Sequence, residues 1–188
     1  MTASITIDEA AAQLKVAERV LIIGCSGSGK STLAQRLSER FNLRYISMDR
    51  DLFWLSGWQM RPRPEIVERL RSFVAESRWI MDGTSPGTLA LRLPRSQLVI
   101  WMRPPRLVSL YGVISRWLRY RGRTRPEMAE GCPEKIDLDF LAYVWNFERT
   151  QSPEIEANLA IFGSEIPVLV LKSRSEIERL LAIIGEDH

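Results

Sequence analysis

The chain has 188 residues, of which 45% are hydrophobic and 26% are charged, and its formal net charge is +3 at pH 7. This composition is that of a globular protein with enough chain to bury a core, and it argues against intrinsic disorder. The two cysteines, Cys25 and Cys132, lack metal or redox spacing, and the only histidine is His188, which excludes histidine-based catalysis.

The chain shows no sign of membrane insertion or secretion. No apolar run approaches the ~20 residues that a membrane helix needs. The N-terminus turns acidic at Asp8-Glu9 and lacks the basic start and apolar centre of a signal peptide. We therefore expect a cytoplasmic protein with no membrane contact.

Short apolar segments alternate with helical patterns along the chain. Thr6-x-x-Glu9 has the form of a capping box and opens an amphipathic helix predicted over 7–18. The later predicted helices cover about 30–40, a segment opened by Pro64, 104–120, 137–150, 153–162, and a last helix capped by Ser175-x-x-Glu178 and ended by Gly185. The predicted strands are 20–23, 44–48, 79–81, 97–102 and 167–171.

Strands that alternate with helices of this length predict a three-layer α/β fold, in which both faces of a parallel sheet are covered. We expect one domain over 1–188, with 1–18 as an N-terminal helical extension. In such sheets ligands bind beyond the carboxyl ends of the strands. The residues with chemical potential in this chain follow those ends.

The first of these strands runs into a phosphate-binding motif. Residues 24–31 read Gly-Cys-Ser-Gly-Ser-Gly-Lys-Ser, which satisfies G-x-x-x-x-G-K-[ST]. Backbone amides of such a loop and the N-terminus of the following helix bind phosphate, so a chance glycine turn is a weak alternative. The motif predicts ATP with Mg²⁺, held by Gly24, Ser26, Gly27, Ser28, Gly29, Lys30, Ser31 and Thr32.

Carboxylates follow the next two strands. Asp49 can accept the proton of an acceptor hydroxyl or hold a metal-bound water, whereas for Asp51 we favour turn formation. Asp82 ends an apolar strand in the manner of a Walker B acid, and with Ser31 it is the predicted metal ligand. Gly83 follows it in place of the glutamate of motor-type ATPases, which favours transfer to a bound acceptor over hydrolysis.

A basic stretch with glycine and proline breaks lies between the fourth and fifth predicted strands. We interpret about 106–135 as a lid segment, in which Arg119, Arg123 and Arg125 stabilise the transferring charge. A solvated helix face and a patch for nucleic acid are the alternatives. Near Asp49, Phe53 and Trp54 are candidates for stacking on the acceptor, although packing is the more common role of such side chains.

Several segments together resemble a known family. They are the phosphate loop with Ile22-Ile23 before it, Asp49, Leu52-Phe53-Trp54, Gly57-Trp58, Trp79-Ile80-Met81-Asp82-Gly83, Gly87-Thr88-Leu89, Arg92-Leu93, Val99-Ile100-Trp101, 119–128 and Gly131-Cys132-Pro133-Glu134. Over about 20–147 the chain is similar to the adenylate-kinase-related proteins of the DNA topology modulation (FlaR-related) family. The resemblance implies a P-loop NTPase fold of the adenylate-kinase-like kind, with a five-stranded parallel sheet, ATP with Mg²⁺, and an arginine-rich lid.

Two departures from that family concern the acceptor. Adenylate kinases have an arginine shortly after Asp-Gly that grips the phosphate of the acceptor nucleotide, but here Thr84-Ser85-Pro86 follows. Arg92 is the candidate to replace it as a substrate-binding residue. The FlaR-like pattern has Asn-Tyr after Asp-Gly and an aspartate near 103, where this chain has Thr84-Ser85 and Arg103.

These features support a kinase that transfers the γ-phosphoryl group of ATP to a small molecule or nucleotide. The acceptor stays open between a nucleoside, a nucleotide and another hydroxylated metabolite. The alternatives are a nucleotide-binding module that acts on a partner or nucleic acid without turnover, and a simple ATPase.

Overall fold

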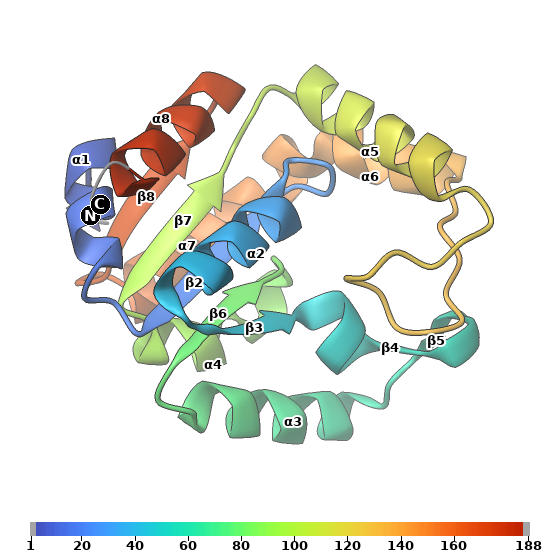
Figure 1. The fold of residues 1–188 in the computed structure, drawn as a ribbon. Coiled ribbons are helices and arrows are strands. Elements are labelled where there is room, and N and C mark those ends of the chain that lie inside the picture. The colour runs from blue at the N-terminus through green and yellow to red at the C-terminus, as the bar shows by residue number, and fades with distance from the viewer. Residues whose placement is uncertain (1–2, 186–188) are drawn as a thin grey trace.

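The computed structural model describes residues 3–185, and a parallel sheet runs through the middle of it (Figure 1). The strands lie in the order β1-β8-β7-β2-β6-β3, and every neighbouring pair is parallel. They are β1 (Ala3–Ser4), β2 (Arg19–Gly24), β3 (Arg44–Ser47), β6 (Trp79–Asp82), β7 (Leu98–Met102) and β8 (Pro167–Leu171).

The five strands expected from the sequence are all present, but the sheet has a sixth. Strand β1 pairs Ala3 with Pro167 and Ser4 with Val168 at the edge formed by β8. The prediction of a five-stranded sheet was therefore wrong by one strand. Strand β1 has only two residues, both exposed, which is too short a segment to show the alternation of apolar and polar side chains typical of a strand.

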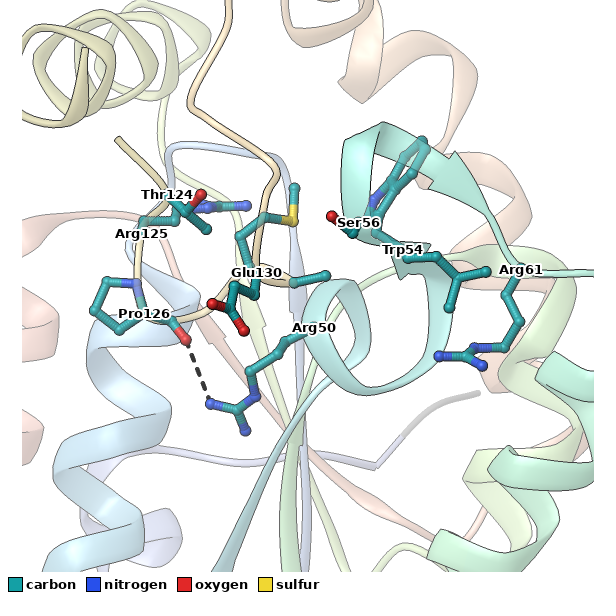
Figure 2. A pocket seen from close by; sticks show the side chains of 11 residues that line it. Arg50, Trp54, Ser56, Arg61, Thr124, Arg125, Pro126 and Glu130 are labelled. Atoms are coloured by element: carbon teal, nitrogen blue, oxygen red, sulfur yellow. Dashed lines mark hydrogen bonds between the residues drawn. The ribbon is translucent and has the colours of Figure 1, made fainter. Parts of the chain in front are cut away.

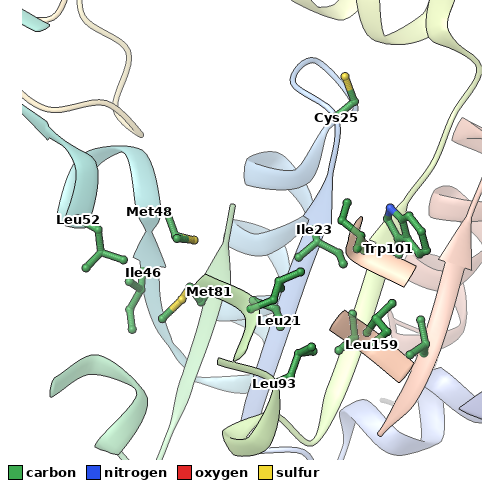
Figure 3. Packing of buried hydrophobic residues seen from close by; sticks show 14 of the residues in the cluster. Leu21, Ile23, Cys25, Ile46, Met48, Leu52, Met81, Leu93, Trp101 and Leu159 are labelled. Atoms are coloured by element: carbon green, nitrogen blue, oxygen red, sulfur yellow. The ribbon is translucent and has the colours of Figure 1, made fainter. Parts of the chain in front are cut away.

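Helices cover both faces of the sheet, as the alternation predicts (Figure 1). They are α1 (Ile7–Leu14), α2 (Lys30–Phe41), α3 (Arg63–Ala75), α4 (Leu89–Arg92), α5 (Arg106–Tyr120), α6 (Leu138–Thr150), α7 (Ser152–Phe162) and α8 (Arg174–Gly185). Successive side chains of a strand point to opposite faces. Leu21 and Ile23 of β2 accordingly pack with α3, α4, α6 and α7 (Figure 3), whereas Val20 and Ile22 pack with α1, α2 and α8.

Two helix ends differ from the expectation. The first helix keeps its Thr6/Glu9 capping box but ends at Leu14 instead of 18, because the chain must turn there to enter β2. The last helix is capped by Ser173, whose hydroxyl accepts from the Glu176 N–H at 3.2 Å, while the Glu176 carboxylate accepts from the Ser173 N–H at 3.2 Å. The Ser175/Glu178 box was wrong by two residues. His188, the only histidine of the sequence, lies outside the described residues.

The connection between β3 and α3 contains structure that the sequence did not indicate. A π-helix (Met48–Phe53) follows β3 directly and leads into a hairpin of β4 (Trp54–Leu55) and β5 (Gln59–Met60). Shorter turns of 3₁₀ type cover Ser56–Trp58, Pro86–Thr88 and Leu93–Arg95. No helix within residues 3–185 combines the length and the apolar character needed to cross a membrane.

Helix α5 lies directly against the phosphate loop. A Cβ placed on Gly112 of α5 would come within 2.1 Å of the Gly27 carbonyl oxygen, and a Cβ on Gly27 within 2.1 Å of the Ser109 carbonyl oxygen. Gly27 also has a φ of 79°, which glycine adopts at little cost. The two glycines therefore set the distance between the loop and α5.

We expect Gly112→Ala to destabilise the protein by about 1–3 kcal/mol, because backbone must move to make room for the methyl group. For a chain of this size the midpoint of thermal unfolding falls by roughly 2–12 °C. Gly87→Ala is the matched control, since a Cβ there meets nothing within 4 Å. Equal midpoints for the two variants, measured by circular dichroism, would contradict the close approach.

Candidate active site

The phosphate loop lies between β2 and α2, at the carboxyl end of the sheet. Gly27 and Gly29 have φ values of 79° and 93°, and the buried Ser28 hydroxyl has no hydrogen-bond partner within the described chain. The Lys30 ammonium donates to the Cys25 carbonyl oxygen at 2.6 Å. Desolvation lowers the pKa of Lys30, and the nearby Asp82 carboxylate opposes that shift. A partly desolvated lysine at the cavity wall is suited to an anionic ligand.

Asp82 and Ser31 meet beside this loop. The Ser31 hydroxyl donates to the Asp82 carboxylate, which is only 4% exposed. Burial raises the pKa of Asp82 to about 6, although Ser31 and Lys30 lower it. The Thr84 hydroxyl joins the end of β6 to the loop, since it accepts from the Gly24 N–H at 2.9 Å and donates to the Gly24 carbonyl at 2.5 Å.

The Ser31–Asp82 pair fits Mg²⁺. This cation takes oxygen ligands and is usually held by one or two carboxylates together with substrate phosphates. A hydroxyl and a carboxylate beside a phosphate loop are such a donor set. Among residues 3–185 no cluster of three or more His, Cys, Asp or Glu side chains offers a cage made of protein alone.

Asp82→Asn should change how stability depends on pH. The unfolded chain ionises this carboxyl near its ordinary value of 3.8, whereas the folded chain ionises it near 6. At pH 8 the folded wild type therefore carries a buried carboxylate that is mostly protonated at pH 5. From pH 5 to pH 8 the wild type should lose about 1–2 kcal/mol relative to Asp82→Asn. Denaturant unfolding in EDTA at both pH values measures this, with the exposed Asp139→Asn as control. A parallel pH dependence of the Asp82→Asn variant and the wild type would contradict it.

The loop between α5 and α6, residues 121–137, lies against the β3–α3 connection (Figure 1). The Gly57 N–H donates to the Gly131 carbonyl at 3.1 Å, and the Trp58 indole to the Pro133 carbonyl at 3.1 Å. The Arg50 guanidinium donates to the Pro126 carbonyl at 3.4 Å (Figure 2). The part of the predicted lid segment that follows α5 is therefore held against the β3–α3 connection.

Ion pairs connect the docked loop with the phosphate loop. Arg125 contacts Asp49 at 3.0 Å and Glu134 at 3.4 Å, and its side chain is 9% exposed. Arg116 of α5 contacts the other oxygen of Glu134 at 2.7 Å and the Ser26 hydroxyl at 3.4 Å. The chain of contacts thus runs from Asp49 to the phosphate loop, and Glu134 is the acid that both arginines share.

The three predicted lid arginines differ in their position. Arg125 lies in the network just described, and Arg119 lines the cavity with no partner among residues 3–185. Arg123 is exposed and does not line the cavity, because its backbone forms a turn that donates to the Tyr120 carbonyl and accepts from the Glu134 N–H. The structure brings Arg119 and Arg125 to the site and leaves Arg123 outside.

The residues predicted to bind the acceptor lie in different places. Asp49 and Phe53 line the cavity. Trp54 faces a second, outer cavity and packs edge-on against Trp58 at 5.2 Å between ring centroids. Arg92 is fully buried, and its guanidinium donates to the carbonyls of Gly83, Thr84 and Ser85. Arg92 thus fixes the loop after β6 instead of lining the cavity.

The central cavity has a volume of about 690 Å³ and extends from the phosphate loop to α6. Its lining includes Lys30, Ser31, Asp49 and Asp82, which are residues that the sequence singled out. It also includes side chains that sequence reasoning missed: Arg36, Ser85, Arg116, Glu127, Phe140 and Tyr143. Burial raises the pKa of Tyr143 to about 12, so its hydroxyl keeps its proton near neutral pH. For α6, the sequence signal that could have indicated a place on the cavity wall was the pair of aromatic residues Phe140 and Tyr143, which are three residues apart and follow the basic stretch.

Known structures share this fold. The chain is similar to the shikimate kinase from Acinetobacter baumannii in complex with shikimate, with a TM-score of 0.58 and 11% identity over 93% of this chain and 95% of that one. It is also similar to the shikimate kinase from Bacteroides thetaiotaomicron, with a TM-score of 0.54 and 14% identity over 91% and 98%. The protein has a P-loop kinase fold. At these identities the likeness establishes the fold alone.

Neither a protein-family model nor a curated protein matches the sequence. The predicted relation to the DNA topology modulation family therefore gains no support, although the coarser expectation of a P-loop kinase fold is confirmed. Within this fold, the residues that sequence analysis selected at the ends of β2, β3 and β6 lie around one cavity.

Proposed function

We propose that the protein transfers the γ-phosphoryl group of ATP to a hydroxyl group of a small acceptor. The observation that carries this proposal is that Lys30, the Ser31–Asp82 pair and Asp49 line one cavity under a docked arginine-bearing loop. The two kinases of similar fold support the same class of reaction.

In this proposal the phosphate loop binds the nucleotide. Its amides and Lys30 would hold the β- and γ-phosphates, and Ser31 and Asp82 would hold Mg²⁺. When bound, the cation neutralises charge on the phosphate oxygens. Arg119 and Arg36 line the same cavity without ion-pair partners among residues 3–185, so both are available to a polyphosphate.

Asp49 is the proposed base. One of its oxygens binds Arg125, and the side chain is still 47% exposed, so the other oxygen is open toward the acceptor. As the acceptor oxygen bonds to the γ-phosphorus, the bond from that phosphorus to the β,γ-bridging oxygen breaks and ADP leaves. The hydroxyl proton passes to Asp49, and Arg125 and Arg119 stabilise the transferring charge.

The alternatives have less support. Gly83 follows Asp82, so no carboxylate at that position activates water for a simple ATPase. Most arginines of the basic stretch are engaged within the protein: Arg103 pairs with Glu148 and Glu156, and Arg106 and Arg121 lie over Trp145 and Trp117. These contacts leave few cations for a nucleic-acid surface. The family label of DNA topology modulation supplies no separate site.

The test is ADP formation from ATP and Mg²⁺ with a panel of nucleosides, nucleotides and hydroxylated metabolites, shikimate included. Stimulation by one acceptor class, with the phosphorylated product identified by mass spectrometry, is the expected result. ATP binding without stimulation by any acceptor would refute the kinase and leave the nucleotide-binding module. ADP formation that no acceptor changes would indicate a simple ATPase.

A further inference from the structure

We term the part of the central cavity around Asp49 the acceptor end. It comprises Asp49, Phe53, Ser85, Arg125, Phe140 and Tyr143, all of which line the central cavity. The aromatic rings come from two elements that are far apart in the sequence. Phe53 belongs to the π-helix after β3, and Phe140 and Tyr143 belong to helix α6. Any acceptor that reaches Asp49 must lie among these side chains.

The two arginines that the sequence suggested for the acceptor and the transferring charge near Asp49, Arg92 and Arg125, already have partners within the protein. Arg125 is 8% exposed and contacts two carboxylates, Asp49 and Glu134. Arg92, the residue expected to bind an acceptor phosphate, has no exposed surface and donates to three backbone carbonyls. Neither guanidinium group is therefore free to balance a phosphate or carboxylate on an acceptor beside Asp49, and such a group would be costly in a partly desolvated site.

Uncharged hydrogen-bonding groups are available instead. The Ser85 hydroxyl and the Tyr143 hydroxyl have no hydrogen-bond partner among the residues that the structure describes, and both residues line the cavity. Ser85 is held at a φ of 29°, a conformation that serine rarely adopts, and the Arg92 contact to its carbonyl maintains it. Such strained residues cluster at active sites, which agrees with the position of Ser85 on the cavity wall.

The aromatic rings provide flat apolar surface. The rings of Phe140 and Tyr143 are stacked, with 6.3 Å between their centroids and 16° between their planes, and Phe147 packs edge-on against Tyr143 at 5.7 Å. Phe53, from the π-helix after β3, lines the same cavity. Such rings stack on a planar or cyclic ligand without requiring charge.

We propose that the acceptor is an uncharged, ring-bearing polyol of the nucleoside class, and not a nucleoside monophosphate or a carboxylate. This inference rests on the proposed kinase function and narrows its substrate. The ring would lie between Phe53 and the α6 aromatics, neutral hydroxyls would bind Ser85 and Tyr143, and the reacting hydroxyl would face Asp49.

The first experiment compares matched acceptors. ADP formation is measured with each of the common nucleosides and its 5′-monophosphate, with ribose and ribose 5-phosphate, and with shikimate as the carboxylate member. We expect at least 10-fold higher kcat/KM for the uncharged member of a pair. Preference for a monophosphate or for shikimate would overturn this inference and leave the kinase function standing. No stimulation by any member would overturn both.

The second experiment uses Ser85→Ala and Tyr143→Phe with the preferred acceptor. Loss of one neutral hydrogen bond should raise the acceptor KM by about 2–10-fold and leave the ATP KM unchanged. Ser56→Ala, at an exposed position on the outer cavity, is the matched control. A rise in the ATP KM in place of the acceptor KM would show that this wall binds the nucleotide, which contradicts the assignment.

Discussion

Lys30→Ala will lower kcat for acceptor-dependent ADP formation by about 10²–10³-fold, the effect of losing one preorganised charge at the transferring group. In the structure the Lys30 ammonium rests on the Cys25 carbonyl at 2.6 Å, within the loop that would surround the phosphates. Weaker binding of ATP should accompany the loss, because the lysine contacts the ground state as well. Steady-state kinetics and equilibrium titration with a fluorescent ATP analogue separate the two effects.

Lys172→Ala is the control for that variant, since Lys172 is exposed and does not line the cavity. Its kinetic constants should match those of the wild type. A Lys30→Ala protein that keeps its circular dichroism spectrum and its full kcat would remove Lys30 from the transfer step, and with it the central part of the proposed function.

Asp49→Asn will lower kcat by about 10²–10⁴-fold, the usual contribution of a positioned general base, while ATP affinity stays near that of the wild type. The amide oxygen of asparagine can still accept from Arg125, so the docked loop should keep its contact. What is lost is the ability to take the hydroxyl proton. Single-turnover kinetics with saturating ATP measure the chemical step directly.

Asp51→Asn is the matched control two residues away. The Asp51 carboxylate accepts from the Ser47 N–H at 2.8 Å and pairs with Arg50, so it stabilises the start of the π-helix and does not line the cavity. This variant should lose thermal stability and retain kcat once folded. Equal losses of kcat in the two variants would indicate that Asp49 also acts only through the local structure.

The sequence predicted those parts of the site that local pattern determines. A buried strand, a glycine-rich loop and an amphipathic helix specify the phosphate loop in consecutive residues, and the same logic places Asp82 at the end of β6. Both lie at the carboxyl edge because parallel strands share that edge. Four of the five longer strands were found because each contains a continuous apolar segment, whereas β3 mixes polar and apolar residues and was placed by the alternation of strands and helices.

The rest depends on contacts between distant segments. Nothing near Arg92 in the sequence shows that its guanidinium turns inward to three carbonyls, since an arginine in a short helix is usually exposed. The sharing of Arg125 between Asp49 and Glu134 joins residues 76 positions apart in one case. Trp54 was considered for the acceptor, but its place on the outer cavity follows from the docking of the 121–137 loop.

Because the 121–137 loop is docked on the hairpin of β4 and β5, the reactivity of one cysteine thiol can be used to measure how often the loop leaves the hairpin. The Cys132 thiol is 1% exposed; it donates to the Leu55 carbonyl at 3.2 Å and accepts from the Trp58 N–H at 3.3 Å. The other cysteine, Cys25, is also buried, and burial raises its thiol pKa to about 11, which makes it a poor nucleophile. Thiol reagents should therefore modify Cys132 only in molecules whose loop has left the hairpin. The rate of Cys132 labelling is then proportional to the fraction of molecules in which the loop is undocked. A decrease in this rate on addition of ATP or acceptor measures how strongly each ligand favours the docked loop.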